Sequence, residues 1–124
     1  MTRKTFREGG GFEEAAAYSR AVRIGRHVAV SGTAAREGGD AYAQTTEALG
    51  RALAAAQELG AGREDVLRTR LLLTPGCDWE GAVRAHGETF AGVDPANTTY
   101  FVSGFIPEGV LVEIELDAIV PEPR

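Results

Sequence analysis

Three carboxylates alternate with apolar residues near the end of the chain. In the stretch LVEIELDAIV, residues 111–120, Glu113, Glu115 and Asp117 occupy every second position, and the positions between them are apolar. This period of two predicts a strand with one acidic and one apolar face. A carboxylate shielded from water can act as a general acid or base, whereas an exposed one is only a solvated polar group. What the three acids face therefore decides whether they do chemistry.

Few other residues offer catalytic or metal-binding chemistry. His27, Cys77 and His86 are scattered, without the spacing typical of zinc ligands, so we expect no metal. His86 shares an apolar stripe with its neighbours and is expected to be packed, and Cys77 has no matched histidine to activate its thiol. The stretch EGGGF, residues 8–12, is not a phosphate loop, because no strand leads into it and no Gly-Lys-Ser/Thr follows. We expect no cofactor.

Length and composition limit the class of protein. The 124 residues fit one domain, residues 1–124, and 18 acidic against 13 basic residues give a net charge of −5, which disfavours a nucleic-acid partner. No run is apolar and long enough to span a membrane, and no secretory leader precedes the domain. The single cysteine cannot form an internal disulfide. We therefore expect a cytoplasmic protein without a membrane partner.

The hydrophobic pattern predicts the order β-β-α-β-α-β-β after a polar start and a flexible EGGGFEE segment. A helical stripe ending at Gly60 predicts the first helix. A second stripe after the capping Asp78 predicts the other helix, with an apolar face made of Trp79, Ala82, Val83, His86 and Phe90. The expected strands cover 18–25, 27–32, 65–73, 98–105 and 110–120, and the expected helices cover 40–60 and 78–90. Two helices covering one face of a single sheet make an α+β fold.

The second face of this sheet has no cover within the chain. The segments 27–32 and 70–73 are apolar or small on both faces, which is typical of strands buried on two sides. We therefore expect an oligomer built sheet against sheet, with the acids at its edge or paired with arginines. Arginines 20, 23 and 26 could meet Glu115 and Asp117 in this way. The alternative is that the acids form an ordinary solvated face.

Several segments resemble the Rid/YjgF family of reactive intermediate deaminases, also called L-PSP endoribonucleases. The resemblance covers nearly the whole chain in order, in YSRAVRIGRHVAVSGT, QTTEALGRALAAAQELGAGREDVLRTRLLLT, DWEGAVRAHGETF and DPANTTYFVSGFIPEGVLVEIELDAIV. It implies a chorismate-mutase-like α+β fold assembled as a homotrimer. In such a trimer the sheets line a central barrel, and small molecules bind in clefts between neighbouring subunits.

The resemblance also implies site residues, with one departure. Deaminases of the family bind the carboxylate of a 2-imino acid with an arginine directly after a Pro-Ala pair. Here Asn97 stands in that position. Tyr18 matches a pocket tyrosine of the family, Ser31 and Gly32 match the small residues beside the ligand, and Glu113 matches the glutamate that positions water.

These positions together define the predicted cleft. Asn97 and Thr99 share a face by the period of two, so we expect both to line the same cleft as Glu113, with Tyr18 nearby. Asn97 could orient a carbonyl, amide or hydroxyl, but the cleft would lack a fixed positive charge to hold a carboxylate. The expected catalytic residues are Glu113 and Asn97, and the expected substrate-binding residues are Tyr18, Ser31, Gly32, Asn97 and Thr99.

Three functions are compatible with this pattern. The first is an enzyme in which Glu113 acts as acid or base on a small imine, enamine or carbonyl compound, and which is a poor 2-imino acid deaminase. The second is a non-catalytic ligand-binding or regulatory trimer that retains the pocket. The third is the ribonuclease or translation-inhibitor activity that the family label names, which the acidic balance disfavours.

Overall fold

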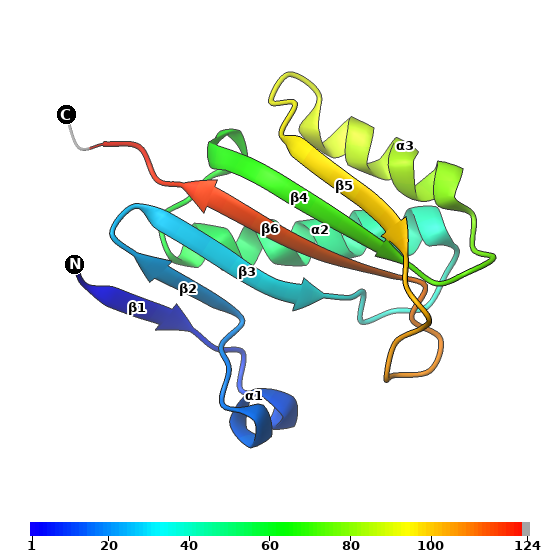
Figure 1. Ribbon diagram of the computed structural model, residues 1–124, viewed down its shortest axis with the longest axis horizontal. Coiled ribbons are helices and arrows are strands. Elements are labelled where there is room, and N and C mark those ends of the chain that lie inside the picture. The colour runs from blue at the N-terminus through cyan, green and yellow to red at the C-terminus, as the bar shows by residue number, and fades with distance from the viewer. Residues whose placement is uncertain (123–124) are drawn as a thin grey trace.

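A single six-stranded sheet carries two long helices on one side (Figure 1). The structure is a computed structural model, and it describes residues 1–122. The strand order is β1-β2-β3-β6-β4-β5; β4 and β5 run parallel, and the other neighbours are antiparallel. The elements are β1 (Arg3–Phe6), α1 (Gly11–Ala16), β2 (Ala21–Ile24), β3 (His27–Thr33), α2 (Ala41–Glu58), a 3-10 turn (Arg63–Asp65), β4 (Val66–Leu73), α3 (Trp79–Phe90), β5 (Ala96–Phe101) and β6 (Val112–Ile119).

Both long helices begin at aspartates that cap them. The Asp40 side chain accepts a hydrogen bond from the Ala43 backbone N–H at 2.8 Å, and Asp78 accepts one from the Gly81 N–H at 3.1 Å. Each bond satisfies a backbone donor that the first helical turn leaves unpaired. The α+β prediction, with both helices on one face of one sheet, is confirmed.

The core lies between the helices and one face of the sheet. Alternate residues of the central strands point into it, including Val30 of β3, Leu71 of β4 and Ile114 of β6, all at most 4% exposed. They pack against small residues of α2 such as Ala48 and Ala52, which let the helix lie close to the sheet. The acidic positions of β6 consequently project from the opposite face.

Two elements at the beginning of the chain differ from the prediction. The polar start contains β1, which adds an edge strand to β2, and part of the flexible EGGGFEE segment forms the short helix α1. The predicted apolar face of α3 is also partly wrong, because Trp79 and Val83 are 50% and 44% exposed while Ala82 and Phe90 are buried. No helix within the described residues is long and apolar enough to cross a membrane.

Candidate functional site

Glu113 lies on the sheet face that no helix covers. It is the second residue of β6, it pairs in register with Leu72 of β4, and it is partly buried. Its neighbours Val112 and Ile114 point into the core and are fully buried, which fixes the direction of the Glu113 side chain. The prediction that the acids face away from the helices is confirmed.

Gly32 allows the Glu113 carboxylate to lie against the backbone of β3. The pairing of β3 with β6 is irregular between Val30 and Thr33, and Gly32 lies within this bulge. A Cβ atom at Gly32 would come within 2.6 Å of Glu113 Oε1. The absence of a side chain at this position therefore makes room for the carboxylate.

Arg20 brings a positive charge to the same place. The residue is 7% exposed, and its Nη1 donates to the Gly32 carbonyl at 2.9 Å and to Thr33 Oγ1 at 3.3 Å. The guanidinium carbon lies 5.8 Å from the centre of the Tyr18 ring. The expectation of a cleft without a fixed positive charge was wrong, because Arg20 lines the same pocket as Glu113.

An open pocket of about 550 Å³ collects these groups. One wall consists of Tyr18, Arg20, Gly32 and Glu113, and an apolar wall comes from the segment between β5 and β6. The remaining lining residues are Phe12, Ala34, Arg51, Gly104, Phe105, Ile106 and Pro107. The pocket is large enough for a small organic molecule and offers it an acid, a cation and apolar surface.

Burial is the main reason that the pKa of the Glu113 carboxyl is raised above its ordinary value. The positive charge of Arg20 opposes this shift, and the negative charge of Glu115 adds to it. No hydrogen bond among residues 1–122 involves the Glu113 side chain, whereas its two acidic neighbours on β6 each have a partner. Arg70 Nη1 lies 3.6 Å from Glu115 Oε1, and His27 Nε2 lies 3.1 Å from Asp117 Oδ2.

Asn97 and Thr99 do not lie in this pocket. Asn97 pairs in register with the fully buried Thr69, so its side chain lies on the helix side of the sheet, opposite Glu113. Thr99 Oγ1 donates to Asn97 Oδ1 at 2.7 Å, Asn97 Nδ2 donates to Thr69 Oγ1 at 3.1 Å, and Thr69 Oγ1 lies 2.7 Å from His86 Nε2. The prediction of one cleft containing Asn97, Thr99 and Glu113 was wrong within a single chain.

The other predicted site residues divide in the same way. Tyr18 and Gly32 line the pocket with Glu113, but the Ser31 hydroxyl donates to the Ser19 carbonyl at 2.6 Å and ties the first hairpin together. Within the single chain, arginines 20, 23 and 26 do not pair with Glu115 or Asp117. Arg23 donates to the carbonyls of Gly25 and Leu59, and Arg26 pairs with Glu122.

Sequence reasoning missed Arg20, although a signal was present. Arg20 follows Tyr18 at a spacing of two, which places both on one side of an extended segment. We had instead grouped it with the two later arginines of the hairpin. Within the described part of the chain, no group of three or more His, Cys, Asp or Glu side chains could hold a metal ion.

Comparisons with known proteins agree on one family. The profile of the family described as Endoribonuclease L-PSP matches residues 11–120. The chain is 42% identical over 116 residues to the uncharacterized protein SCO2049 of Streptomyces coelicolor, a match that spans 89% of this chain and 87% of that protein.

Solved structures show the same fold. The crystal structure of Rv2704 from Mycobacterium tuberculosis, described as a member of the YjgF/YER057c/UK114 family, superposes with a TM-score of 0.91 at 41% identity. That match covers 96% of this chain and 100% of the other. The YjgF-family protein NMB1025 of Neisseria meningitidis gives a TM-score of 0.86 at 22% identity, covering 99% and 98% of the two chains, which supports the fold alone.

Proposed function

The chain belongs to the Endoribonuclease L-PSP family, and on that premise we propose that it binds a small organic molecule beside Glu113, which acts as a general acid and base. One observation carries the proposal: the single acid of β6 without a partner among residues 1–122 is partly buried in a pocket, beside a cation, with a raised pKa. An acid whose pKa is shifted toward neutrality is suited to accept and return a proton.

The reaction class that fits is hydrolysis of a small imine or its enamine tautomer. The Glu113 carboxylate takes a proton from water while the water oxygen bonds to the imine carbon. The proton passes to the imine nitrogen, which gives a carbinolamine. Glu113 then takes the proton of the carbinolamine hydroxyl and returns it to the amine nitrogen, the carbon–nitrogen bond breaks, and ammonia leaves as the carbonyl forms. Arg20 stabilises the ionised state of Glu113 before the step, and the apolar segment around Phe105 limits competing water.

The protein is proposed to be a poor deaminase of 2-imino acids. The position where the family carries its carboxylate-binding arginine is Asn97, and this side chain lies on the other face of the sheet. A guanidinium supplies both charge and two parallel donors, which an amide cannot replace. We therefore expect weak acceleration with the imine formed from 2-aminoacrylate.

We propose a homotrimer as the working assembly in the cytoplasm, where Cys77 remains a free thiol. The edge strand β5 is exposed along its whole length, and large apolar side chains on β2, β4 and β5 are also exposed, namely Ile24, Leu67, Tyr100 and Phe101. An uncovered edge with apolar neighbours favours association. Light scattering should give about three times the 13.1 kDa chain mass, and a monomer mass at micromolar concentration would contradict the assembly.

Replacing Glu113 by glutamine tests the proposed catalytic role. Glu113→Gln keeps the shape but removes the acid and base, so the weak acceleration of ammonia release from 2-aminoacrylate should be lost and the rate should fall to the uncatalysed rate. Glu115→Gln is the matched control, since it changes the next outward-facing acid of β6, which is paired with Arg70. Equal rates in Glu113→Gln and the unaltered protein would mean that Glu113 is only a solvated polar group without a catalytic role. Ligand binding without any turnover would favour a non-catalytic trimer.

A further inference from the structure

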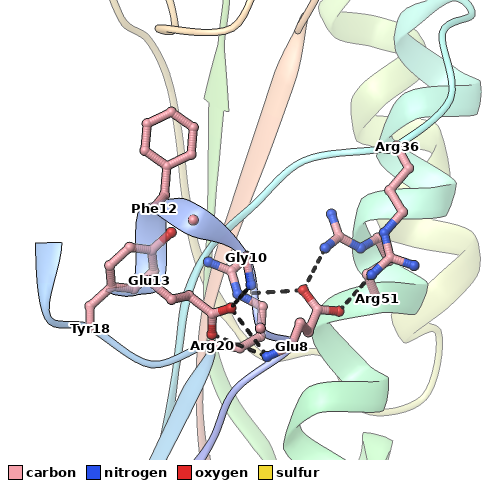
Figure 2. Close-up of a pocket in the computed structure, with 10 residues that line it drawn as sticks. Glu8, Gly10, Phe12, Glu13, Tyr18, Arg20, Arg36 and Arg51 are labelled. Atoms are coloured by element: carbon pink, nitrogen blue, oxygen red, sulfur yellow. Dashed lines mark hydrogen bonds and ion pairs between the residues drawn. The ribbon is translucent and has the colours of Figure 1, made fainter. Parts of the chain in front are cut away.

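The carboxylate of Glu8 is held between two arginines in a second pocket. Glu8 Oε1 lies 2.7 Å from Arg51 Nη2, and Glu8 Oε2 lies 3.0 Å from Arg36 Nη2. Figure 2 shows the two guanidinium groups reaching Glu8 from the side of α2, while Glu8 comes from the segment between β1 and α1. Each carboxylate oxygen therefore has its own arginine.

A third arginine completes the cluster. Arg20 Nε lies 4.0 Å from Glu8 Oε1, and its side chain is buried. Glu13 lines the same cavity and feels the charge of Arg20, but its carboxylate accepts hydrogen bonds from the backbone N–H groups of Glu8 and Gly10 and so holds the loop. Arg51 Nε is buried and has no hydrogen-bond partner in residues 1–122. The cluster thus sets three arginines against the two acids of the loop, Glu8 and Glu13.

The arginine cluster is continuous with the pocket of Glu113. Its own cavity, of about 350 Å³, is lined by Glu8, Arg36 and residues 9–13, and it shares Phe12, Tyr18, Arg20 and Arg51 with the Glu113 pocket. A small molecule could place one end among the arginines and the other toward Glu113.

The Glu8 side chain can leave without unfolding the loop. Glu13 holds the backbone of Glu8 and Gly10, so only the side chain of Glu8 needs to rotate. Arg36 is mostly exposed, and its side chain contacts Glu8 alone among the acids of the described chain. The Arg36 contact is therefore an ion pair near the surface, whereas the contacts of Glu8 with Arg51 and Arg20 are more buried and must also break when the side chain leaves.

We propose that Arg20, Arg36 and Arg51 form a binding site for the carboxylate of a small organic acid, and that Glu8 occupies this site as an internal competitor. The occupant in the structure is itself a carboxylate, and two guanidinium groups meet its two oxygens, which is the arrangement that arginines favour for this group. The proposal deepens the proposed function by naming the ligand class, and rests on it only for the orientation toward Glu113.

Removing the internal competitor should increase the affinity for an added acid. A tethered carboxylate competes at a high effective concentration, so Glu8→Gln should bind pyruvate at least tenfold more tightly than the unaltered protein, as measured by calorimetry. Glu14→Gln is the matched control, because Glu14 is an exposed acid of the same segment with no contact to the arginines. Pyruvate affinity should not change in that variant.

Further variants locate the site. In the Glu8→Gln background, Arg36→Gln should weaken pyruvate binding about tenfold, and Arg51→Gln should abolish it. Arg51 also donates to the Ala34 carbonyl, so thermal unfolding of that variant is measured, and the exposed Arg36 serves as the test if Arg51→Gln does not fold. Acetone, which lacks the carboxylate, should not bind, and inorganic phosphate should bind more weakly than pyruvate.

The results separate this site from the proposed catalysis. Pyruvate affinity is measured without turnover, so it tests the arginine site whatever rate of ammonia release Glu113→Gln shows. Equal pyruvate affinity with and without Glu8, binding that survives both arginine changes, or tighter binding of phosphate than of pyruvate would each overturn the assignment of a carboxylate site.

Discussion

The two faces of the sheet carry polar groups of opposite character. On the helix side, Thr99, Asn97, Thr69 and His86 form a continuous chain in which each polar group has a partner. Burial lowers the pKa of His86, so the ring stays neutral and can accept the Thr69 hydroxyl through Nε2. On the other face, Glu113 is partly buried without a hydrogen bond among residues 1–122.

This difference separates packing from chemistry. Asn97 and Thr99 are exposed on β5, but their chain of hydrogen bonds meets the fully buried Thr69 hydroxyl, and a buried hydroxyl that loses its partners bears the cost of desolvation. An unsatisfied acid beside a pocket keeps its hydrogen-bonding capacity for a ligand or water. We therefore assign the chain around Asn97 to stability and Glu113 to function.

The largest effect on stability should come from breaking the chain at Thr69. Thr69→Val keeps the shape of the buried side chain but removes the hydroxyl that joins Asn97 to His86. We expect unfolding by urea to show a loss of about 1–3 kcal/mol, because both partners lose a hydrogen bond at once. Any turnover at Glu113 should remain.

Thr98 provides the control for that change. Thr98 lies on the neighbouring strand β5, is exposed, and its hydroxyl accepts from Arg68 Nη1 at 3.2 Å, so Thr98→Val should change stability by less than about 0.5 kcal/mol. Loss of turnover in Thr69→Val with unchanged stability would reverse the assignment and place the Asn97 chain in the reaction.

A smaller effect, on rate instead of stability, should come from Gly32. A methyl group in Gly32→Ala would lie 2.6 Å from Glu113 Oε1, and the flexible carboxylate must move away. We expect turnover to fall about tenfold, on the order of 1.4 kcal/mol, because the acid is displaced from its reacting position. The turnover rate is measured from the ammonia released in samples quenched at successive times.

Gly38→Ala is the comparison for Gly32→Ala, because a Cβ at Gly38 meets no atom within 4 Å. Both variants should fold. If Gly32→Ala reacts as fast as Gly38→Ala, the carboxylate does not need its position against β3, and the proposed geometry of the site fails.

The sequence was sufficient for the main fold because its strongest patterns are long. The alternation in β6 extends over several residue pairs, and the apolar stripe of α2 extends over several helical turns. In both elements the apolar side predicted from the sequence is the buried side. The missed elements lack such patterns. In β1 only Phe6 is even partly buried, and α1 is too short to show a period.

The candidate site was harder to predict because it depends on register. A period of two shows which residues of one strand point to the same face. It does not show which residues of β5 point to the same face of the sheet as Glu113 of β6. That relation is set by the pairing of Asn97 with Thr69 and of Glu113 with Leu72 across β4. Arg20 is held by a hydrogen bond to the carbonyl of Gly32, which lies in a bulge that no local sequence pattern predicts.

The pKa of Glu113 is the most direct test, since it requires no knowledge of the substrate. The carboxyl carbon can be followed by NMR as the pH is changed, with Glu113→Gln used to assign the signal. The account predicts a midpoint clearly above the ordinary value of 4.5, because burial in the pocket disfavours the charged form. A midpoint at or below 4.5 would show a solvated or tightly paired carboxylate, and it would contradict the assignment of Glu113 as the acid and base of this protein.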